Sequence, residues 1–188
     1  MFFLKKKNKN YFQPRLPFKE LKELSKTDYE KIFFKLPIGK KKGQFIEIIL
    51  FQNPIYLIRL KRFIVENKIF KFYFVAKKID EIFDKVDKIK IEGFCERCNA
   101  QKIDYFVLTK TGKIIFLCKE CCRNLEKNEE IIKKGYRYSF VLNLERHQSK
   151  EFIKKFKEKL GIKKISNKKI YNLLYELQQQ QEEEEEED

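Results

Sequence analysis

The sequence predicts an α+β fold with a small basic N-terminal module, a central β-hairpin flanked by two cysteine pairs, and a helical C-terminal part. Three observations lead to this prediction. Four of the five cysteines form two Cys-x2-Cys pairs between residues 95 and 121. Two short apolar runs between the pairs are typical of β-strands. The segments on either side carry apolar residues at the spacing of amphipathic helices. A chain of 188 residues fits one domain or two small ones.

The N-terminal segment, residues 1–35, is basic and contains Pro14 and Pro17, which indicate an extended lead-in. Its first residues hold only a three-residue apolar run, shorter than a secretory signal requires. Side chains near Ser25 and Asp28 could cap a helix that follows. At the other end of the chain, residues 178–188 are Gln and acidic residues, and we expect this tail to be disordered.

Residues 36–90 are predicted to form a module with helices. A turn with two glycines, Gly39 to Gly43, precedes the strand-like run Phe45 to Phe51. Asn53-Pro54 is a typical helix start, because Asn caps well and Pro suits the first helical position. A second helical pattern extends from about Ile69 to Ile89.

Residues 91–126 contain the cysteine pairs, in the pattern Cys95-x2-Cys98-x19-Cys118-x2-Cys121. Two close thiol pairs about twenty residues apart match the ligand spacing of a structural zinc ribbon. Strands are expected at 103–108 and 113–117, joined by a turn at 110–112. The pattern therefore predicts a β-hairpin with two metal-binding knuckles and a structural Zn²⁺ held by four thiolates.

Other interpretations of the cysteines remain at this level. An iron–sulfur centre also takes four thiolates. Disulfides are disfavoured because they require an oxidising compartment. Five unrelated core cysteines are disfavoured because they would not cluster in one segment. Cys122 follows Cys121 directly, so either could be the fourth ligand. We favour Cys121, because its spacing from Cys118 repeats that of the first pair.

Residues 127–177 are predicted to form a strand and a helical hairpin. The run Tyr136 to Leu142 alternates as a strand would and places three aromatic residues on one face. Two helices, Gln148 to Leu160 and Ser166 to Gln180, are expected after it, with Ser149 and Ser166 as caps and Gly161 between them.

The charge of the chain favours a polyanionic partner. The formal net charge is +15, and removing the seven acidic residues 182–188 leaves +22. Lysine side chains that neutralise phosphates release counterions and so give affinity for DNA or RNA. An alternative is compositional, because Lys, Ile, Phe, Asn and Tyr are common in proteins from AT-rich genomes. We therefore give weight to basic residues only where they coincide with a motif. The residues predicted to bind nucleic acid are Gly39, Lys40, Lys42 and Gly43 of the glycine turn and Arg97, Lys102, Lys110 and Lys113 around the cysteine pairs.

The pattern Pro37-Ile38-Gly39-Lys40-x-Lys42-Gly43, followed by Ile46, Ile48 and Asn53-Pro54-x-Tyr56-Leu57-x-x-Leu60, resembles the small C-terminal domain of exonuclease X-like proteins. Ile38, Asn53 and Arg59 stand where that family commonly has Phe, Asp and Trp. The resemblance covers about twenty-five residues and implies an accessory module of nucleic-acid-processing proteins. The glycines could let backbone N–H groups approach a phosphate, or they could form only a tight turn with a basic edge.

No catalytic residue is predicted. A nuclease of the HNH type would need a histidine between the cysteine pairs, and the single histidine, His147, lies outside them. A closed four-thiolate site has no open position for water or substrate. We expect an intracellular protein of the cytoplasm, the nucleus or a virus that binds DNA or RNA in an accessory role. The alternatives are a non-catalytic, zinc-binding subunit of a larger assembly that contacts protein partners, and a nuclease.

Overall fold

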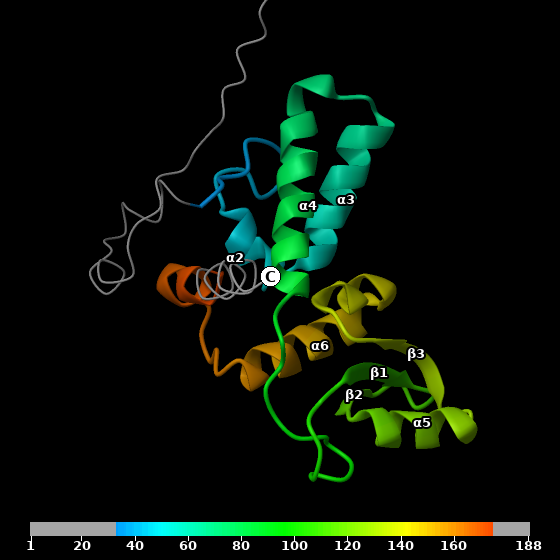
Figure 1. The fold of residues 1–188 in the computed structure, drawn as a ribbon. Helices are drawn as coiled ribbons and strands as arrows, with labels where there is room; N and C mark the ends of the chain where they lie inside the picture. The colour runs from blue at the N-terminus through cyan, green and yellow to red at the C-terminus, as the bar shows by residue number, and fades with distance from the viewer. Residues whose placement is uncertain (1–32, 175–188) are drawn as a thin grey trace, which may run out of the picture.

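The computed structural model describes residues 33–174. Most of the basic segment 1–35, the helix expected after Ser25 and the acidic tail lie outside the described residues. The described part combines helices with one antiparallel sheet, as the α+β prediction states (Figure 1). Its labelled helices and strands are α2 (Ile46–Leu50), α3 (Pro54–Glu66), η2 (Phe70–Phe72), α4 (Tyr73–Asp87), β1 (Tyr105–Thr109), β2 (Ile114–Leu117), α5 (Lys119–Lys127), β3 (Ile131–Gly135), η3 (Tyr138–Asn143) and α6 (Arg146–Lys159), and a further helix follows from residue 167.

The strand predicted at 45–51 is wrong, since this run forms the short helix α2. Ile46, Ile49 and Leu50 are all buried, which is the spacing of one helical face. The only strand-like pairing nearby in the described chain is an isolated bridge between Lys35 and Phe45. Because a strand needs a continuous hydrogen-bonded neighbour, the run folds back as a helix instead.

Helices α3 and α4 form an antiparallel hairpin (Figure 1). The Asn53 side chain accepts a hydrogen bond from Tyr56 N at 3.2 Å and Pro54 is the first helical residue, as predicted from the sequence. The α3 side chains Leu57, Leu60 and Ile64 are buried. On α4 the buried residues are Val75, Ala76, Ile79, Ile82, Phe83 and Val86. The two apolar stripes therefore account for the core-facing sides of the hairpin.

The sheet has the strand order β2-β1-β3, with both pairs antiparallel. Strands β1 and β2 form the predicted hairpin, in which Phe106 lies opposite Phe116. Strand β3 and helix α5 were not expected from the sequence. They return the chain to the free edge of β1, with an irregularity in register between Leu108 and Thr109.

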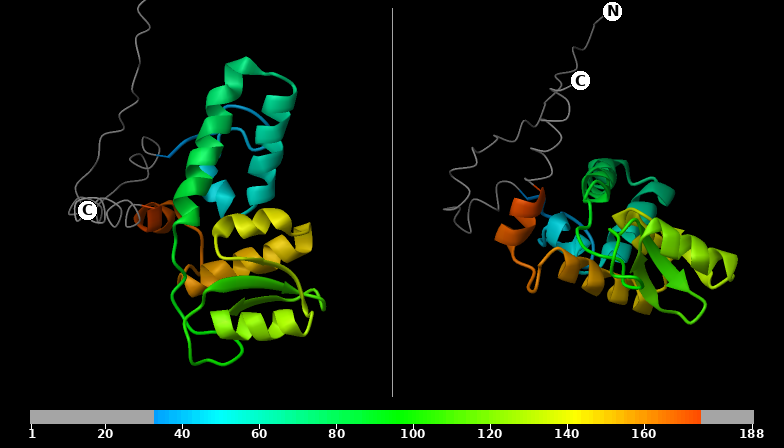
Figure 2. Two further views of the ribbon diagram at one scale, coloured as in Figure 1. Left: turned by 45° about the vertical axis from the view of Figure 1, so that its right-hand side comes forward. Right: turned by 60° about the horizontal axis from the view of Figure 1, so that its bottom comes forward.

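The sheet separates two hydrophobic clusters. Phe106, Leu108 and Phe116 face the main core, whereas Val107 and Leu117 face a smaller cluster that contains the cysteines and Leu125 of α5. This alternation is the two-residue period of a β-strand. Helices α6 and α5 accordingly lie on opposite sides of the sheet (Figure 2). The main core also draws residues from α2, α3, α4, η3 and α6.

The strand predicted at 136–142 is also wrong, because Tyr138–Asn143 forms the 3-10 helix η3. Tyr138 and Phe140 are buried in the main core, but Tyr136 is 63% exposed, so the three aromatic residues do not share a face. The Tyr138 hydroxyl donates a hydrogen bond to the Leu50 carbonyl at 2.7 Å. Contacts of this kind, between residues 88 positions apart, override the local alternating pattern.

Helix α6 begins earlier than predicted and uses a different cap. Glu145 and Gln148 form a capping box, whereas Ser149 is buried inside the helix and donates to the Glu145 carbonyl at 2.9 Å. Gly161, at φ +67°, ends the helix as expected. The next helix begins at residue 167 with Ser166 Oγ accepting from Lys169 N at 3.3 Å, and it is described as far as residue 174. Within residues 33–174, no helix is both long enough and apolar enough to cross a membrane.

Candidate metal centre

The first cysteine pair lies in a tight loop that precedes β1. Cys95 N donates to the Gln101 carbonyl at 2.8 Å, and Asn99 N donates to the Cys95 carbonyl at 2.9 Å. Asn99 has a φ of +54°, a conformation that asparagine tolerates better than most residues. Arg97 N also donates to Cys95 Sγ at 3.4 Å. These bonds hold the loop in the knuckle predicted for this pair.

The second pair lies at the N-terminus of helix α5, where the sequence predicted a second knuckle after the hairpin. Cys118 is the N-cap residue, and its sulfur accepts from Cys121 N at 3.4 Å. Asp104 Oδ2 accepts from Lys119 N at 2.8 Å and so also satisfies a donor of the first turn. The positive end of the helix dipole favours thiolates at this position.

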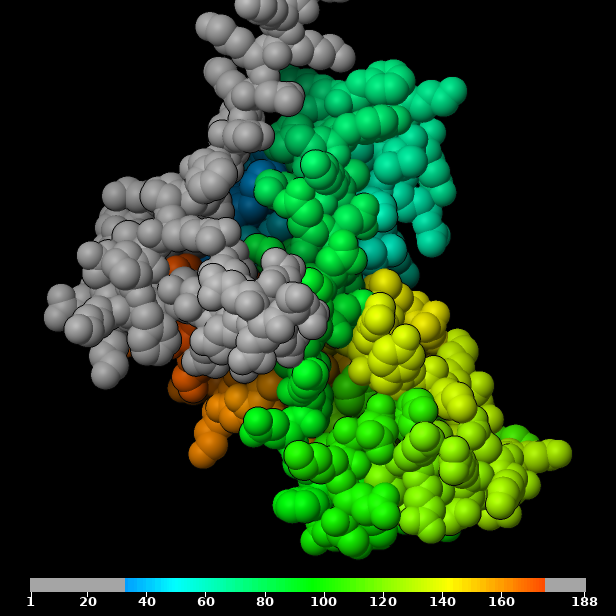
Figure 3. Space-filling model, in the orientation of Figure 1, coloured from blue at the N-terminus to red at the C-terminus, as the bar shows by residue number. Residues whose placement is uncertain are grey.

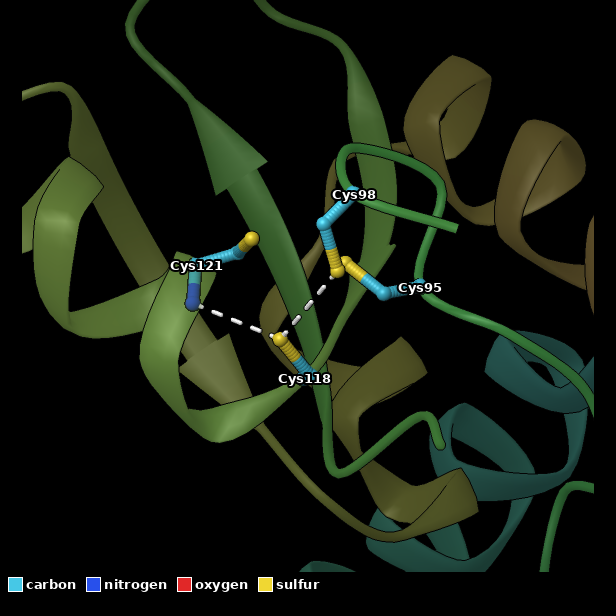
Figure 4. A group of neighbouring side chains, drawn as sticks. All are labelled: Cys95, Cys98, Cys118 and Cys121. Carbon is cyan, nitrogen blue, oxygen red and sulfur yellow. Dashed lines mark hydrogen bonds between the residues drawn. The ribbon is translucent and has the colours of Figure 1, made fainter. Parts of the chain in front are cut away.

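The sulfur atoms of Cys95, Cys98, Cys118 and Cys121 all lie within 4.8 Å of one another. Figure 4 shows the four side chains pointing toward a common centre, two from the knuckle and two from the start of α5. A tetrahedral metal with bonds of about 2.3 Å to sulfur places the sulfurs roughly 3.8 Å apart. Cys98 Sγ and Cys118 Sγ are separated by 3.9 Å. The geometry therefore fits a four-thiolate metal site.

Cys122 is excluded from this group, which answers the question of the fourth ligand in favour of Cys121. Its thiol is buried, 1% exposed, in the smaller cluster. Consecutive helical residues point about 100° apart, so Cys121 and Cys122 cannot both face the same centre. Burial raises the pKa of the Cys122 thiol, as expected for a packed side chain.

The four grouped thiols do not ionise alike. For Cys95, burial acts to raise the pKa, but backbone N–H groups outweigh it and lower the pKa to about 6. Burial and the neighbouring sulfurs raise the pKa of Cys121 to about 12. Four thiolates this close repel one another, and a divalent cation would supply the missing positive charge.

The structure places the predicted nucleic-acid-binding residues in two separate groups, one around the β1–β2 hairpin and one in the loop at 39–43. Arg97 and Lys102 lie on the knuckle side of the hairpin, and Lys110 and Lys113 flank its turn. All four side chains are exposed, and within the described chain none has a carboxylate within 4.0 Å. The loop at 39–43 lies beside the α3–α4 hairpin, away from the sheet (Figure 1).

Three backbone N–H groups of the loop at 39–43 already donate hydrogen bonds to acceptors within the protein. Gly39 and Gly43 have φ values of +86° and +82°, in the region that glycine adopts without strain. Lys42 N donates to Gly39 O at 3.1 Å, Gly43 N to Leu36 O at 2.8 Å, and Lys41 N to the Tyr56 hydroxyl at 3.1 Å. A phosphate would therefore meet mainly the exposed side chains of Lys40 and Lys42.

Two features of the structure had no clear signal in the sequence. One is the carboxylate of Glu47, which is buried and accepts hydrogen bonds from Phe34 N at 3.2 Å. The other is a group of exposed aromatic side chains around the turn between α3 and α4. Phe63, which lies beside the buried stripe of α3 and not within it, was the sign that could have revealed the second feature.

No protein-family model matches the chain, and comparisons with curated proteins and with solved structures likewise found no significant match. The functional interpretation therefore depends on the geometry described above.

Proposed function

We propose that this protein binds DNA or RNA as a non-catalytic accessory factor in nucleic-acid processing, with a structural Zn²⁺ holding the four-cysteine module. The observation that carries the proposal is the set of exposed cations on that module. Arg97, Lys102, Lys110 and Lys113 surround a rigid hairpin, and their charges are not neutralised by carboxylates of the described chain. Cations that keep their charge free are suited to phosphate contacts.

The donor set supports zinc in a structural role. Four thiolates at tetrahedral separation are typical ligands of Zn²⁺, and they leave no open position for a water or a substrate. When bound, the ion would join the knuckle to α5 and replace apolar contacts that the small cluster cannot supply. An iron–sulfur centre is the chemical alternative, and metal analysis with an absorption spectrum distinguishes the two.

The contact between the glycine loop and α3 supports the resemblance to the exonuclease X-like C-terminal domain. The two parts of that motif, the Gly-Lys turn and the Pro-x-Tyr helix start, are in direct contact through Tyr56. If the resemblance is correct, Lys40 and Lys42 would add a second phosphate-contacting group to that of the hairpin. Both groups fit an accessory role beside a processing enzyme.

A non-catalytic, zinc-binding subunit that contacts proteins in a larger assembly is the second candidate. The observation that favours it is the apolar surface near the sheet, where Phe94 is 58% exposed, Ile132 53% and Tyr136 63%. Large exposed apolar side chains are the kind of group that a protein partner covers.

Metal analysis combined with salt-dependent binding tests the proposal. We expect one zinc per chain and affinity for labelled single-stranded or duplex oligonucleotides that falls steeply with salt.

Each lost phosphate contact should reduce the slope of log K against log salt by about 0.9 on duplex DNA. The double substitution Lys110→Gln with Lys113→Gln should flatten the slope, whereas Lys85→Gln with Lys88→Gln, two exposed lysines at the end of α4, controls for net charge. Salt-independent affinity, or equal slopes for all three proteins, would contradict the proposal. Copurification with one protein partner and no affinity for oligonucleotides would favour the second candidate.

A further inference from the structure

The tip of the α3–α4 hairpin, residues 62–74, exposes large apolar side chains. Figure 1 shows this turn at the end of the hairpin that lies away from the sheet, and Figure 3 shows it at the upper end of the coloured, described residues. The exposed fractions are 51% for Phe63, 47% for Val65, 72% for Phe70, 38% for Tyr73 and 51% for Phe74. Aromatic side chains this exposed are unusual when they are concentrated within thirteen residues.

Packing of the hairpin does not require these side chains. Leu60 and Ile64 of α3 and Val75 and Ile79 of α4 already form the buried interface. Two of the exposed rings, Phe70 and Tyr73, contact each other with centroids 5.1 Å apart, and Phe74 meets Phe34 in a T-shaped contact with centroids 6.1 Å apart. The tip thus presents aromatic faces to solvent on a rigid, helical support.

The charge around the tip is predominantly positive. Between residues 59 and 78 the only acidic residue is Glu66, and it lies 3.9 Å from Arg62 in an exposed pair. Of the other basic residues in this stretch, Lys61 pairs with Asp80, and Lys77 and Lys78 pair with Glu81. Arg59, Lys68 and Lys71 are exposed and have no carboxylate partner within 4.0 Å among the described residues. The partner that this surface complements is therefore an anion with apolar or aromatic groups.

Cationic residues lie next to the aromatic residues of the tip along the chain. Lys71 lies between Phe70 and Phe72 in the chain, with its Nζ 5.7 Å from the Phe72 ring centroid. Lys68 occupies the turn itself, at φ +51°. Insertion of this turn into a bilayer would carry both ammonium groups toward the hydrocarbon, which is costly. Stacking of bases on the rings instead leaves each ammonium group beside a phosphate.

We propose that the hairpin tip is a stacking platform for the bases of single-stranded nucleic acid. The inference builds on the proposed function and specifies the form of nucleic acid and the surface that contacts it. Phe63, Phe70 and Phe74 supply ring faces, and Lys68 and Lys71 contact the backbone between the bases. Single strands are selected because their bases are free to stack, whereas duplex bases are already stacked on one another.

Fluorescence anisotropy with a labelled 12-mer of single-stranded DNA, its RNA counterpart and the DNA duplex tests the platform. Replacing one stacking ring should weaken single-strand affinity by about 5-fold to about 150-fold. We expect this loss for Phe70→Ala and Phe63→Ala, with an unchanged salt slope and little effect on the duplex. Phe70→Trp should retain affinity. Tyr136→Ala, which removes an aromatic side chain that is 63% exposed elsewhere, is the matched control and should bind like the parent protein.

The outcomes separate this inference from the proposed function. If the parent protein binds none of the oligonucleotides, both fail. If the parent protein binds the oligonucleotides and both Phe variants retain full affinity, the platform is overturned. The cations around the β1–β2 hairpin would then still account for binding. Binding to phosphatidylserine vesicles that is lost in Phe70→Ala, with single-strand affinity unchanged, would also overturn the platform and assign the tip to membranes. Unchanged thermal unfolding of the variants establishes that affinity, and not folding, is being compared.

Discussion

The Tyr56 hydroxyl accepts a hydrogen bond from the Lys41 backbone N–H at 3.1 Å, and this bond closes the glycine loop onto α3. A Cβ added at Gly39 would lie 2.5 Å from the same hydroxyl oxygen, whereas one added at Gly43 would meet nothing within 4 Å. Both glycines have positive φ values. The two positions therefore share a backbone requirement but differ in the space available.

Gly39→Ala should destabilise the protein more than Gly43→Ala. Each substitution has a conformational cost of roughly 1–2 kcal/mol from the left-handed backbone. Gly39→Ala adds the clash with Tyr56, and Tyr56→Phe should relieve part of that extra cost. Urea unfolding of the two single variants, Tyr56→Phe and the Gly39→Ala/Tyr56→Phe double variant forms a double-mutant cycle. If the changes in unfolding free energy of Gly39→Ala and Tyr56→Phe are additive in the double variant, the Tyr56 hydroxyl does not limit the space at Gly39.

Glu47 should make the protein less stable as the pH rises. Burial raises the pKa of this carboxyl from 4.5 to about 7, although its backbone hydrogen bonds, including the one from Phe34, and Lys85 and Lys78 oppose the change. Below about pH 4.5 the group is protonated in both folded and unfolded chains, so it imposes no penalty. Between pH 4.5 and 7 the unfolded chain loses its proton first, which favours unfolding. Above pH 7 the loss is complete at about 3 kcal/mol.

Glu47→Gln isolates this effect, because an amide keeps the acceptor for Phe34 N but does not ionise. We expect the variant to be more stable than the parent protein at pH 8 and to differ little from it at pH 5. Urea unfolding of both proteins between pH 5 and 8 measures the difference, in which the contributions of the cysteines cancel. A difference in unfolding free energy that stays constant over this range would rule out a raised pKa for Glu47.

Cys121 and Cys122 should respond differently to substitution. Cys121→Ser removes a member of the four-sulfur group and should abolish stoichiometric zinc binding. Cys122→Ser changes a neighbouring buried thiol by one atom and should retain one zinc per chain, with a modest loss of stability. Metal analysis of the purified variants makes the comparison. Loss of zinc from Cys122→Ser alone would show that the fourth ligand has been misassigned.

The predictable parts of the molecule were those that depend on local chemistry. The helix start at Asn53-Pro54, the hairpin between the cysteine pairs and the end of α6 at Gly161 each follow from the preferences of residues that are close together in the sequence. The grouping of Cys95, Cys98, Cys118 and Cys121 was predictable from their spacing, because two close thiol pairs about twenty residues apart are typical of a metal site. The preference for Cys121 over Cys122 followed from the repeated x2 spacing, and helix α5 supplies the physical reason for it.

The incorrect parts were short apolar runs. Residues 45–51 and 136–142 are seven residues long, and a run of that length fits a buried strand and a buried helical turn equally well. The choice was made by distant partners, such as the Phe34 backbone for α2 and the Leu50 carbonyl for η3. Helix α5 was missed because its first turn consists of residues interpreted as a knuckle. Exposed lysines are common throughout the chain, so their grouping on the hairpin or at the tip could not be inferred without the fold.

Tyr138→Phe should destabilise the protein by about 1–2 kcal/mol, since it leaves the buried Leu50 carbonyl without its donor. Tyr138 is 1% exposed, and burial raises the pKa of its hydroxyl, so this group remains a neutral donor throughout the working pH range. Its ring also contacts Phe156, with centroids 4.9 Å apart, and these contacts persist in the Phe variant. Tyr136→Phe removes an exposed hydroxyl and serves as the control, which should leave stability unchanged. Thermal and urea unfolding of the two variants separate the hydrogen bond from ring packing. Equal stability of both would mean that the bond between η3 and α2 contributes nothing to holding the helical hairpin and the sheet around one core.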